Sequence, residues 1–207
     1  MCFKSFFKYT DGFTAISGVV ALLLGSYALF KRFIEKANVE LSIGDTLYFV
    51  RTASFNIEKI QLTCNFINKS NKSGVINKMM LKLFQTDKPN NLTELDWDIF
   101  YKYARGELGE RQAKYESETY PIIVKGRDSN FQAIEFIVNN IKIIDLKKGS
   151  YTINVLGWVN QTDINKKPNI NEDIFITLEE RDIEKINSRE KQGPVFIPIQ
   201  VNKWKIS

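Results

Sequence analysis

Apolar and polar residues alternate along most of the chain after Ala37, which is the period of a β-strand with one buried face. The clearest case is residues 60–66, IQLTCNF, in which every second side chain is apolar. Turn-forming residues such as the NKSNKSG segment at 68–74 separate these runs. The alternation predicts strands at Val39–Ile43, Leu47–Val50, Ile60–Phe66, Val75–Phe84, Tyr120–Val124, Phe131–Val138, Tyr151–Val159, Asp173–Leu178 and Val195–Val201.

Residues 87–118 give no single period. Asp87–Asn91 surrounds Pro89 and is predicted to be a loop. The aromatic residues at 97–103 are spaced three to four apart, which fits a short helix or an irregular strand, and both interpretations stay open. Ala104–Glu118 is polar, contains Gly106 and Gly109, and is predicted to be a mobile insert.

One helix is predicted after Ala37, at Glu179–Lys191. Ile183 and Ile186 lie three residues apart on an otherwise charged segment, and Gly193-Pro194 ends it. The strands show no alternation with helices, which disfavours a parallel sheet. We therefore expect a mainly β fold, an antiparallel β-sandwich of the immunoglobulin type with one C-terminal helix, although the Cys–Trp–Cys signature of antibody domains is absent.

Gly12–Phe30 is a run of nineteen residues without a charge, bounded by Asp11 and by Lys31-Arg32. This is about the length that an α-helix needs to cross a bilayer core, so the pattern predicts a single N-terminal transmembrane helix. The division expected is a short segment at 1–11, the transmembrane helix with its juxtamembrane extension at 12–36, and the β-sandwich at 37–207. The residues assigned to the membrane anchor are Gly12, Phe13, Leu22, Leu23, Leu24, Phe30, Lys31 and Arg32.

Two other interpretations of this run stay open. Lys4, Lys8 and the small residues Ser26 and Ala28 fit a cleaved signal peptide, and a buried helix is the third interpretation. Basic residues flank the run on both sides, so the positive-inside rule gives nearly a tie. We expect a single-pass membrane protein whose β domain faces the cytoplasm rather than the periplasm.

Charge adds little to this picture. The formal net charge is +5, from 29 basic and 24 acidic residues that are interleaved along the chain. Such a mixture is typical of a solvated surface. Nucleic acid is therefore an unlikely partner, and Lys31, Arg32 and Lys36 are assigned to lipid headgroups.

The absence of histidine excludes Ser-His-Asp and Cys-His catalysis and every histidine-containing zinc site. The two cysteines, Cys2 and Cys64, cannot form a four-thiolate site, and Cys64 fits a small core residue. No Gly-rich phosphate loop of usable spacing occurs. We expect no cofactor, no metal and no catalytic residues.

Three clusters could carry chemistry, and each has a simpler interpretation. Asp96 and Asp98 flank Trp97 and could act as an acid–base pair, but neighbours on a strand point to opposite faces. Acidic residues at 179–184 fit the positive end of a helix dipole. A basic and aromatic set could bind nucleic acid, although three glutamates dilute its charge; it comprises Tyr101, Lys102, Tyr103, Arg105, Arg111, Lys114 and Tyr115.

Several segments together resemble a group of uncharacterised bacterial membrane-anchored proteins that have one N-terminal transmembrane helix and an Ig-like β-sandwich. The matching segments are Phe30-Lys31-Arg32, residues 66–83 (FINKSNKSGVINKMMLKL), Pro121–Gly126, Gly149-Ser150-Tyr151 with Gly157-Trp158, and Asp182–Ile186. The resemblance covers most of the chain and implies the same architecture. It brings no known activity.

These observations favour a non-catalytic, membrane-anchored component that binds, senses or assembles with another protein, or with itself. An edge strand near Pro198 could accept a strand from such a partner. Two alternatives remain: a membrane-associated enzyme that uses carboxylates and a divalent ion, and a domain that binds a small ligand in a cleft.

Overall fold

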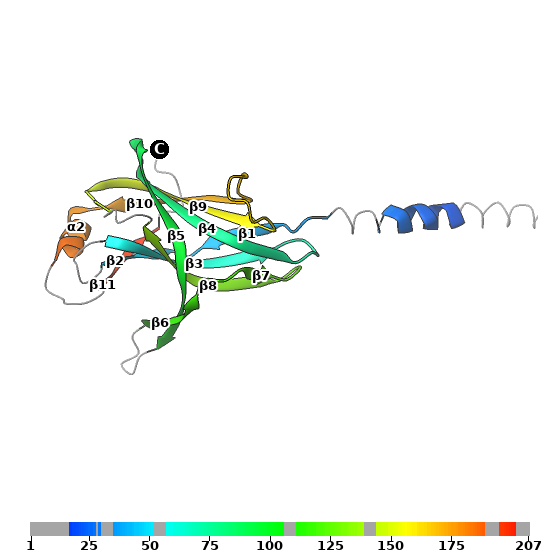
Figure 1. The fold of residues 1–207 in the computed structure, drawn as a ribbon, viewed down its shortest axis with the longest axis horizontal. Helices are drawn as coiled ribbons and strands as arrows, with labels where there is room; N and C mark the ends of the chain where they lie inside the picture. The colour runs from blue at the N-terminus through cyan, green and yellow to red at the C-terminus, as the bar shows by residue number, and fades with distance from the viewer. Residues whose placement is uncertain are drawn as a thin grey trace, which may run out of the picture. The chain divides into compact units, whose positions relative to one another are not determined.

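The computed structural model describes residues 17–27, 29, 35–51, 57–105, 111–138, 144–188 and 195–201. The chain divides into two compact units, residues 1–36 and residues 37–207. The second unit contains the labelled elements of Figure 1. These are β1 (Val39–Ile43), β2 (Thr46–Arg51), β3 (Ile57–Asn68), β4 (Gly74–Gln85), β5 (Lys88–Arg105), β6 (Arg111–Glu118), β7 (Ile122–Val124), β8 (Ser129–Val138), β9 (Gly149–Val159), β10 (Ile170–Leu178), α2 (Glu180–Asn187) and β11 (Val195–Gln200).

The first unit contains a helical segment at residues 17–27, in which Leu22, Leu23 and Leu24 are exposed. Within the described residues, no helix is long and apolar enough to cross a membrane.

The prediction of a single-pass transmembrane helix, and of a membrane location with a cytoplasmic domain, is therefore wrong. The uncharged run predicts one continuous helix, whereas its described helical part is too short to span a bilayer. The remaining anchor residues, Gly12, Phe13, Phe30, Lys31 and Arg32, lie outside the described residues.

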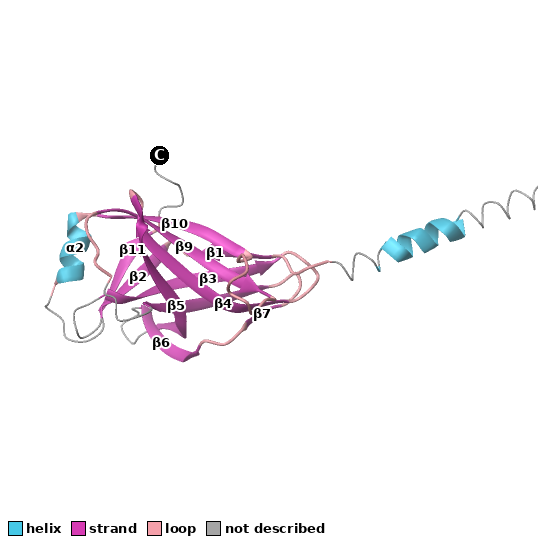
Figure 2. Ribbon diagram, turned by 45° about the horizontal axis from the view of Figure 1, so that its top comes forward, coloured by secondary structure: helices cyan, strands magenta, loops and turns pink. Residues whose placement is uncertain are grey.

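The fold of the second unit is mainly β, and its described strands form one antiparallel sheet that curls on itself (Figure 2). The main path through the sheet is β10-β9-β4-β5-β8-β3-β2-β11. β1 joins the edge of β3, β6 joins the edge of β5, and β7 joins the edge of β4. The expected sandwich of two separate sheets is corrected to one continuous curled sheet.

β5 makes the sheet continuous. Its first part, Lys88 to Asp96, pairs with β4, and its second part, Leu95 to Tyr101, pairs with β8. From Ile99 to Arg105 it pairs with β6 on its other edge, so Ile99 to Tyr101 have partners on both sides. A shift in register between Trp97 and Ile99 marks the place where the strand turns from one half of the sheet to the other. Figure 1 shows β5 running from the β4 hairpin towards β6.

The course of β5 explains the errors between residues 87 and 118. Pro89 is the second residue of β5 and does not lie in a loop. The aromatic segment at 97–103 belongs to the same strand, which is irregular there because its register shifts between Trp97 and Ile99. The polar segment predicted as a mobile insert contains β6, which is antiparallel to β5.

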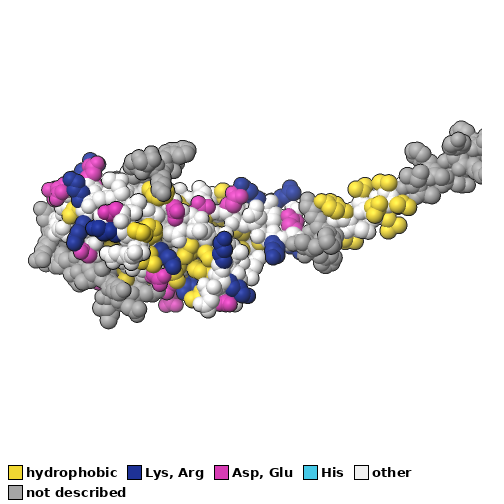
Figure 3. All heavy atoms as spheres, turned by 90° about the horizontal axis from the view of Figure 1, so that it is seen from above, with side chains coloured by type: hydrophobic (Ala, Val, Ile, Leu, Met, Phe, Trp, Pro, Cys, Tyr) yellow, Lys and Arg dark blue, Asp and Glu magenta, His cyan; other side chains and the backbone are white. Residues whose placement is uncertain are grey.

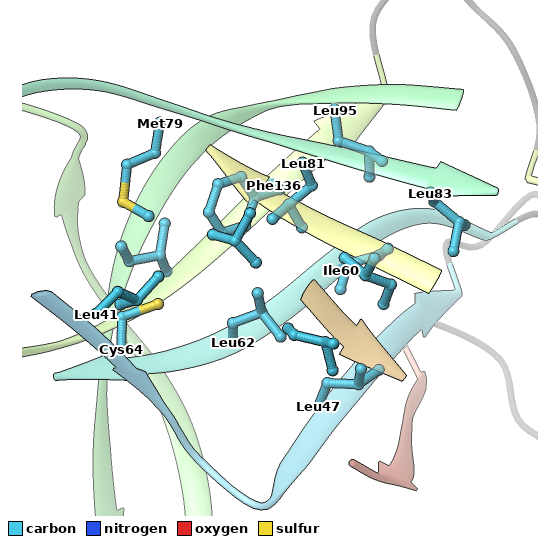
Figure 4. Close-up of a cluster of buried hydrophobic side chains, with 14 of the residues drawn as sticks. Leu41, Leu47, Ile60, Leu62, Cys64, Met79, Leu81, Leu83, Leu95 and Phe136 are labelled. Atoms are coloured by element: carbon cyan, nitrogen blue, oxygen red, sulfur yellow. The ribbon is translucent and has the colours of Figure 1, made fainter. Parts of the chain in front are cut away.

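The core lies inside the curl, where the alternating apolar side chains of both halves meet. Leu81 and Ile153 come from one half, and Leu62 and Phe136 from the other, and all are buried. Figure 4 shows Leu62, Leu81, Leu95 and Phe136 pointing into this shared interior. Cys64 belongs to it as predicted, and burial raises the pKa of its thiol to about 12. Close packing of both halves against each other stabilises the curl.

Helix α2 lies between β10 and β11 in the chain and is fixed at both ends. At its start, Glu179 and Asp182 form a reciprocal capping box, so the acidic cluster there caps the helix. At its end, the buried Arg51 guanidinium of β2 donates a hydrogen bond to the Ile186 carbonyl oxygen at 3.1 Å. A cation at this end also matches the helix dipole.

The Arg51 contact can be tested by truncation. Arg51→Ala removes the hydrogen bond to the Ile186 carbonyl oxygen at the end of α2. We therefore expect the free energy of unfolding to fall by about 3 kcal/mol. Arg181, an exposed arginine on the same helix that pairs with Glu179, is the matched control. Arg181→Ala should cost less than about 1 kcal/mol, measured by urea denaturation of the full chain. Equal losses in the two variants would show that Arg51 does not hold the helix.

Candidate functional site

A buried carboxylate, Glu135, lies on the side of β8 that faces away from the core. Ile134 and Phe136 on either side of it point into the core, so alternation directs Glu135 outwards. Its cross-strand neighbour on β3 is Gln61, and both residues are only 1% exposed. An ionisable side chain on the outer face of a sheet is ordinarily solvated, so this burial sets Glu135 apart.

Three side chains donate hydrogen bonds to the Glu135 carboxylate. The Lys59 ammonium donates to Oε1 at 2.7 Å, and the Gln61 amide and the Tyr101 hydroxyl each donate to Oε2 at 3.1 Å. Lys59 also pairs with Asp98, at 3.6 Å from Nζ to Oδ2. We call these five residues, Lys59, Gln61, Asp98, Tyr101 and Glu135, the Glu135 network.

Strand register brings the network together from three strands. Lys59 and Gln61 are two apart on β3 and therefore point the same way. Tyr101 of β5 pairs with Ala133, two residues before Glu135, which places the tyrosine diagonally across from the carboxylate. The register shift after Trp97 sets Asp98 near Lys59.

The protonation states of the network follow from this geometry. Burial raises the pKa of Tyr101, and the Glu135 charge and hydrogen bond raise it further, so the hydroxyl stays protonated and donates. Burial alone would lower the pKa of Lys59, but its hydrogen bond and attraction to Glu135, with a contribution from Asp98, outweigh burial and raise it. Lys59 is therefore an ammonium and Tyr101 a neutral phenol.

The hydrogen bonds of the network connect β3, β5 and β8. Glu135 already accepts three hydrogen bonds, so it has little capacity to act as a general base. The described part of the chain contains no group of three or more Asp, Glu or Cys side chains that could hold a metal ion. A metal ion at Glu135 would have to displace the Lys59 ammonium, which already donates to Oε1.

The clusters proposed from sequence are separated by the fold. Asp96 pairs with Lys78 of β4 at 3.1 Å, whereas Asp98 pairs with Lys59 of β3, so the two carboxylates do not converge. In the basic and aromatic set, Tyr101 belongs to the Glu135 network and Lys102 pairs with Glu116. The side chains of Tyr103, Arg105 and Arg111 lie outside the described residues. Figure 3 shows acidic and basic side chains interspersed over the visible face.

Sequence reasoning did not find the Glu135 network. Alternation identifies Lys59, Gln61 and Glu135 only as the polar side of two strands, and it contains no information about which strands are neighbours. The available signal in the sequence was that Glu135 shares its side of the strand at 131–137 with two large apolar residues, Phe131 and Ile137, and not with other polar residues.

One cavity of about 410 Å³ lies at the hairpin between β4 and β5, beside residues 144–147. Its lining includes Gln85, Lys88, Asn91 and Lys147. Small-ligand sites are predominantly apolar with a few placed polar groups. The rest of the lining includes apolar and aromatic residues, so the cavity is mixed in character: Leu83, Phe84, Leu92, Ile144, Leu146 and Tyr151.

Comparison with known proteins gives no family. No protein-family model matches the chain, and no curated protein matches it. Among solved structures, the chain is similar to Spo0M, a sporulation control protein from Bacillus subtilis, with 13% identity over 74% of this chain and a TM-score of 0.33. It is also similar to a protein from Archaeoglobus fulgidus, with 11% identity over 70% of this chain, 98% of that chain, and a TM-score of 0.30. The chain spans 56% of the Spo0M chain. At these TM-scores the likeness carries no conclusion about fold or function.

The structure predicts that Lys59 and Glu135 are strongly coupled. A double-mutant cycle with Lys59→Met and Glu135→Gln should give a coupling energy of about 1–3 kcal/mol, because removing Lys59 leaves the buried Glu135 charge with only two neutral donors, Gln61 and Tyr101. The exposed pair Lys82–Glu94, at 3.1 Å between adjacent strands, is the control and should couple by less than about 1 kcal/mol. Denaturant unfolding of the full chain measures both cycles. Equal coupling in the two pairs would contradict the assigned role of burial.

Proposed function

We propose that residues 37–207 form a non-catalytic domain that binds another protein through the outer face of the sheet around the Glu135 network. The observation that carries this proposal is the placement of exposed aromatic side chains around the network. Phe131, Tyr115 and Phe196 are 59%, 57% and 39% exposed. Single exposed apolar residues are ordinary on a protein surface, but a group of them on one face is typical of an interaction site.

Strand register assigns these three aromatics to the same face as Glu135. Phe131 is four residues before Glu135 on β8, so both point the same way. Tyr115 of β6 is the cross-strand partner of Tyr101. At the other end, Phe196 of β11 pairs with Val50, and Val50 pairs with Lys59. The aromatics therefore flank the network on three sides. We call this surface the aromatic face, with Tyr115, Phe131 and Phe196 as its exposed members.

The network supports binding by keeping the aromatic face rigid. Its hydrogen bonds connect β3, β5 and β8 on the side of the sheet that faces away from the core. A surface that is already ordered loses less conformational entropy when a partner docks. Large rigid aromatics are also the residues most often enriched at interface hot spots.

Strand addition at β11 is not part of this proposal. The Val201 amide donates to the Asp45 carbonyl oxygen at 2.9 Å, on the β2 side. Along a strand, the N–H and C=O groups of successive residues point to opposite edges. Residues 201, 199 and 197 therefore direct these groups towards β2, and the nitrogen of Pro198 faces the other edge of β11. Proline has no N–H to donate, so it interrupts the edge that a partner strand would need.

The test compares surface variants of the full chain. Phe131→Ser and Tyr115→Ser should lower recovery of a stoichiometric partner by about tenfold or more, because they remove exposed aromatics without disturbing the core. Recovery is measured by co-purification with the tagged chain from lysate of its own organism, and self-association by light scattering across a concentration series.

Ile164→Ser is the matched control, since Ile164 is a large exposed apolar residue in the loop between β9 and β10. It should leave recovery unchanged. Wild-type recovery by Phe131→Ser, an equal loss in Ile164→Ser, or a repeated failure to recover any partner, including a second copy, would each refute the proposal.

A further inference from the structure

We infer that the Glu135 network receives the guanidinium group of an arginine from the partner protein. This inference rests on the proposed function, because it specifies what the aromatic face recognises. It follows from three features of the network: an excess of negative charge, an unfilled hydrogen-bond acceptor, and the aromatic ring of Tyr101 beside them.

The charge of the network is opposite to that of the whole chain. Glu135 and Asp98 supply two negative charges and Lys59 one positive charge, while Tyr101 stays neutral. The chain as a whole carries a formal charge of +5. A cationic side chain is therefore the complement that this part of the surface attracts.

The unfilled acceptor is the side-chain carbonyl oxygen of Gln61. Its amide nitrogen donates to Glu135, which fixes the orientation of the group, and the buried Oε1 accepts no hydrogen bond from any described residue. Rotating the amide by half a turn would place its oxygen against the Glu135 carboxylate, so the network cannot supply a donor to Oε1 by rearranging Gln61. A buried acceptor without a donor is costly. Because Oε1 has almost no exposed area, a donor from the partner removes that cost only if docking displaces the side chains that cover it.

Asp98 supplies a second, more accessible acceptor. Its side chain is 38% exposed, and its contact with Lys59 is the longer of the two that this lysine makes. A carboxylate accepts several hydrogen bonds, so Asp98 retains capacity for another donor. The Tyr101 hydroxyl donates to the Glu135 carboxylate at 3.1 Å, and the Gln61 amide donates to the same oxygen, so the tyrosine ring lies beside the network.

A guanidinium fits this set better than other ligands. It is planar, carries five donors that can reach two separate acceptors, and stacks on aromatic rings. A lysine ammonium lacks the planar fork, a metal ion would compete with Lys59 for Glu135, and an anion would meet the net negative charge. Arginine is also among the residues enriched at protein interface hot spots.

The first test is a titration of the isotope-labelled full chain with N-acetyl-arginine amide, followed by NMR. The neutral isostere N-acetyl-citrulline amide is the ligand control. We expect saturable shifts of the Gln61 side-chain amide and of the Asp98 and Tyr101 backbone amides with the arginine probe alone. Asp98→Asn should weaken these shifts about tenfold, and Gln61→Met, which removes the unfilled acceptor, should weaken them as well.

Asp96→Asn is the matched protein control, because Asp96 lies two residues away on the same strand but pairs with Lys78. It should leave the titration unchanged. Equal shifts with the citrulline probe, or an unchanged titration in Asp98→Asn, would overturn the inference.

The partner assay distinguishes this inference from the proposed function. Loss of partner in Phe131→Ser with full retention in Asp98→Asn would overturn arginine recognition alone. Retention in Phe131→Ser would overturn the proposed function. Loss in both variants, with retention in Asp96→Asn, supports both.

Discussion

The pairing of β5 with both halves of the sheet is the constraint on which the rest of this structure depends. Leu95 and Asp96 are the residues that pair with β4 on one edge and with β8 on the other. Through this short overlap the β10-β9-β4 half and the β8-β3-β2-β11 half become one sheet. The curl that follows buries the alternating apolar residues of both halves against each other, so a sequence with period-two patterning can bury a single core without forming two separate sheets.

The same strand also generates the candidate binding surface. After the register shift at Trp97, β5 contributes Asp98 and Tyr101 to the outer side of the second half. These residues meet Lys59, Gln61 and Glu135 only because β5, β8 and β3 are neighbours in this order. The network therefore depends on the topology, and its satisfied hydrogen bonds in turn reinforce the three strands. A single structural feature thus accounts for the continuous sheet and for an ordered outer face flanked by exposed aromatics.

Several elements were predictable from local pattern, and others required knowledge of distant pairing. Alternation at 60–66 and at Val39–Ile43 lies within β3 and β1, and the spacing of Ile183 and Ile186 lies within α2. The first part of β5 was missed because Pro89 and the polar residues after it are typical of a loop, while strand pairing overrides that preference. An irregular strand at 97–103 was one of two open interpretations, and it is the one the structure has. The burial of Glu135 was not predictable, since it depends on Lys59 and Tyr101 reaching across from other strands.

Native-state hydrogen exchange of the full chain tests the continuity of the sheet through β5 most directly. If β5 joins the two halves, the backbone amides of Leu95 and Asp96 that bond within the sheet should exchange only by global unfolding. Their opening free energies should then equal those of the slowest amides in β3 and β4. If these β5 amides instead exchange by local opening while β3 and β4 stay protected, the two halves are independent sheets, which contradicts a single sheet held together by β5.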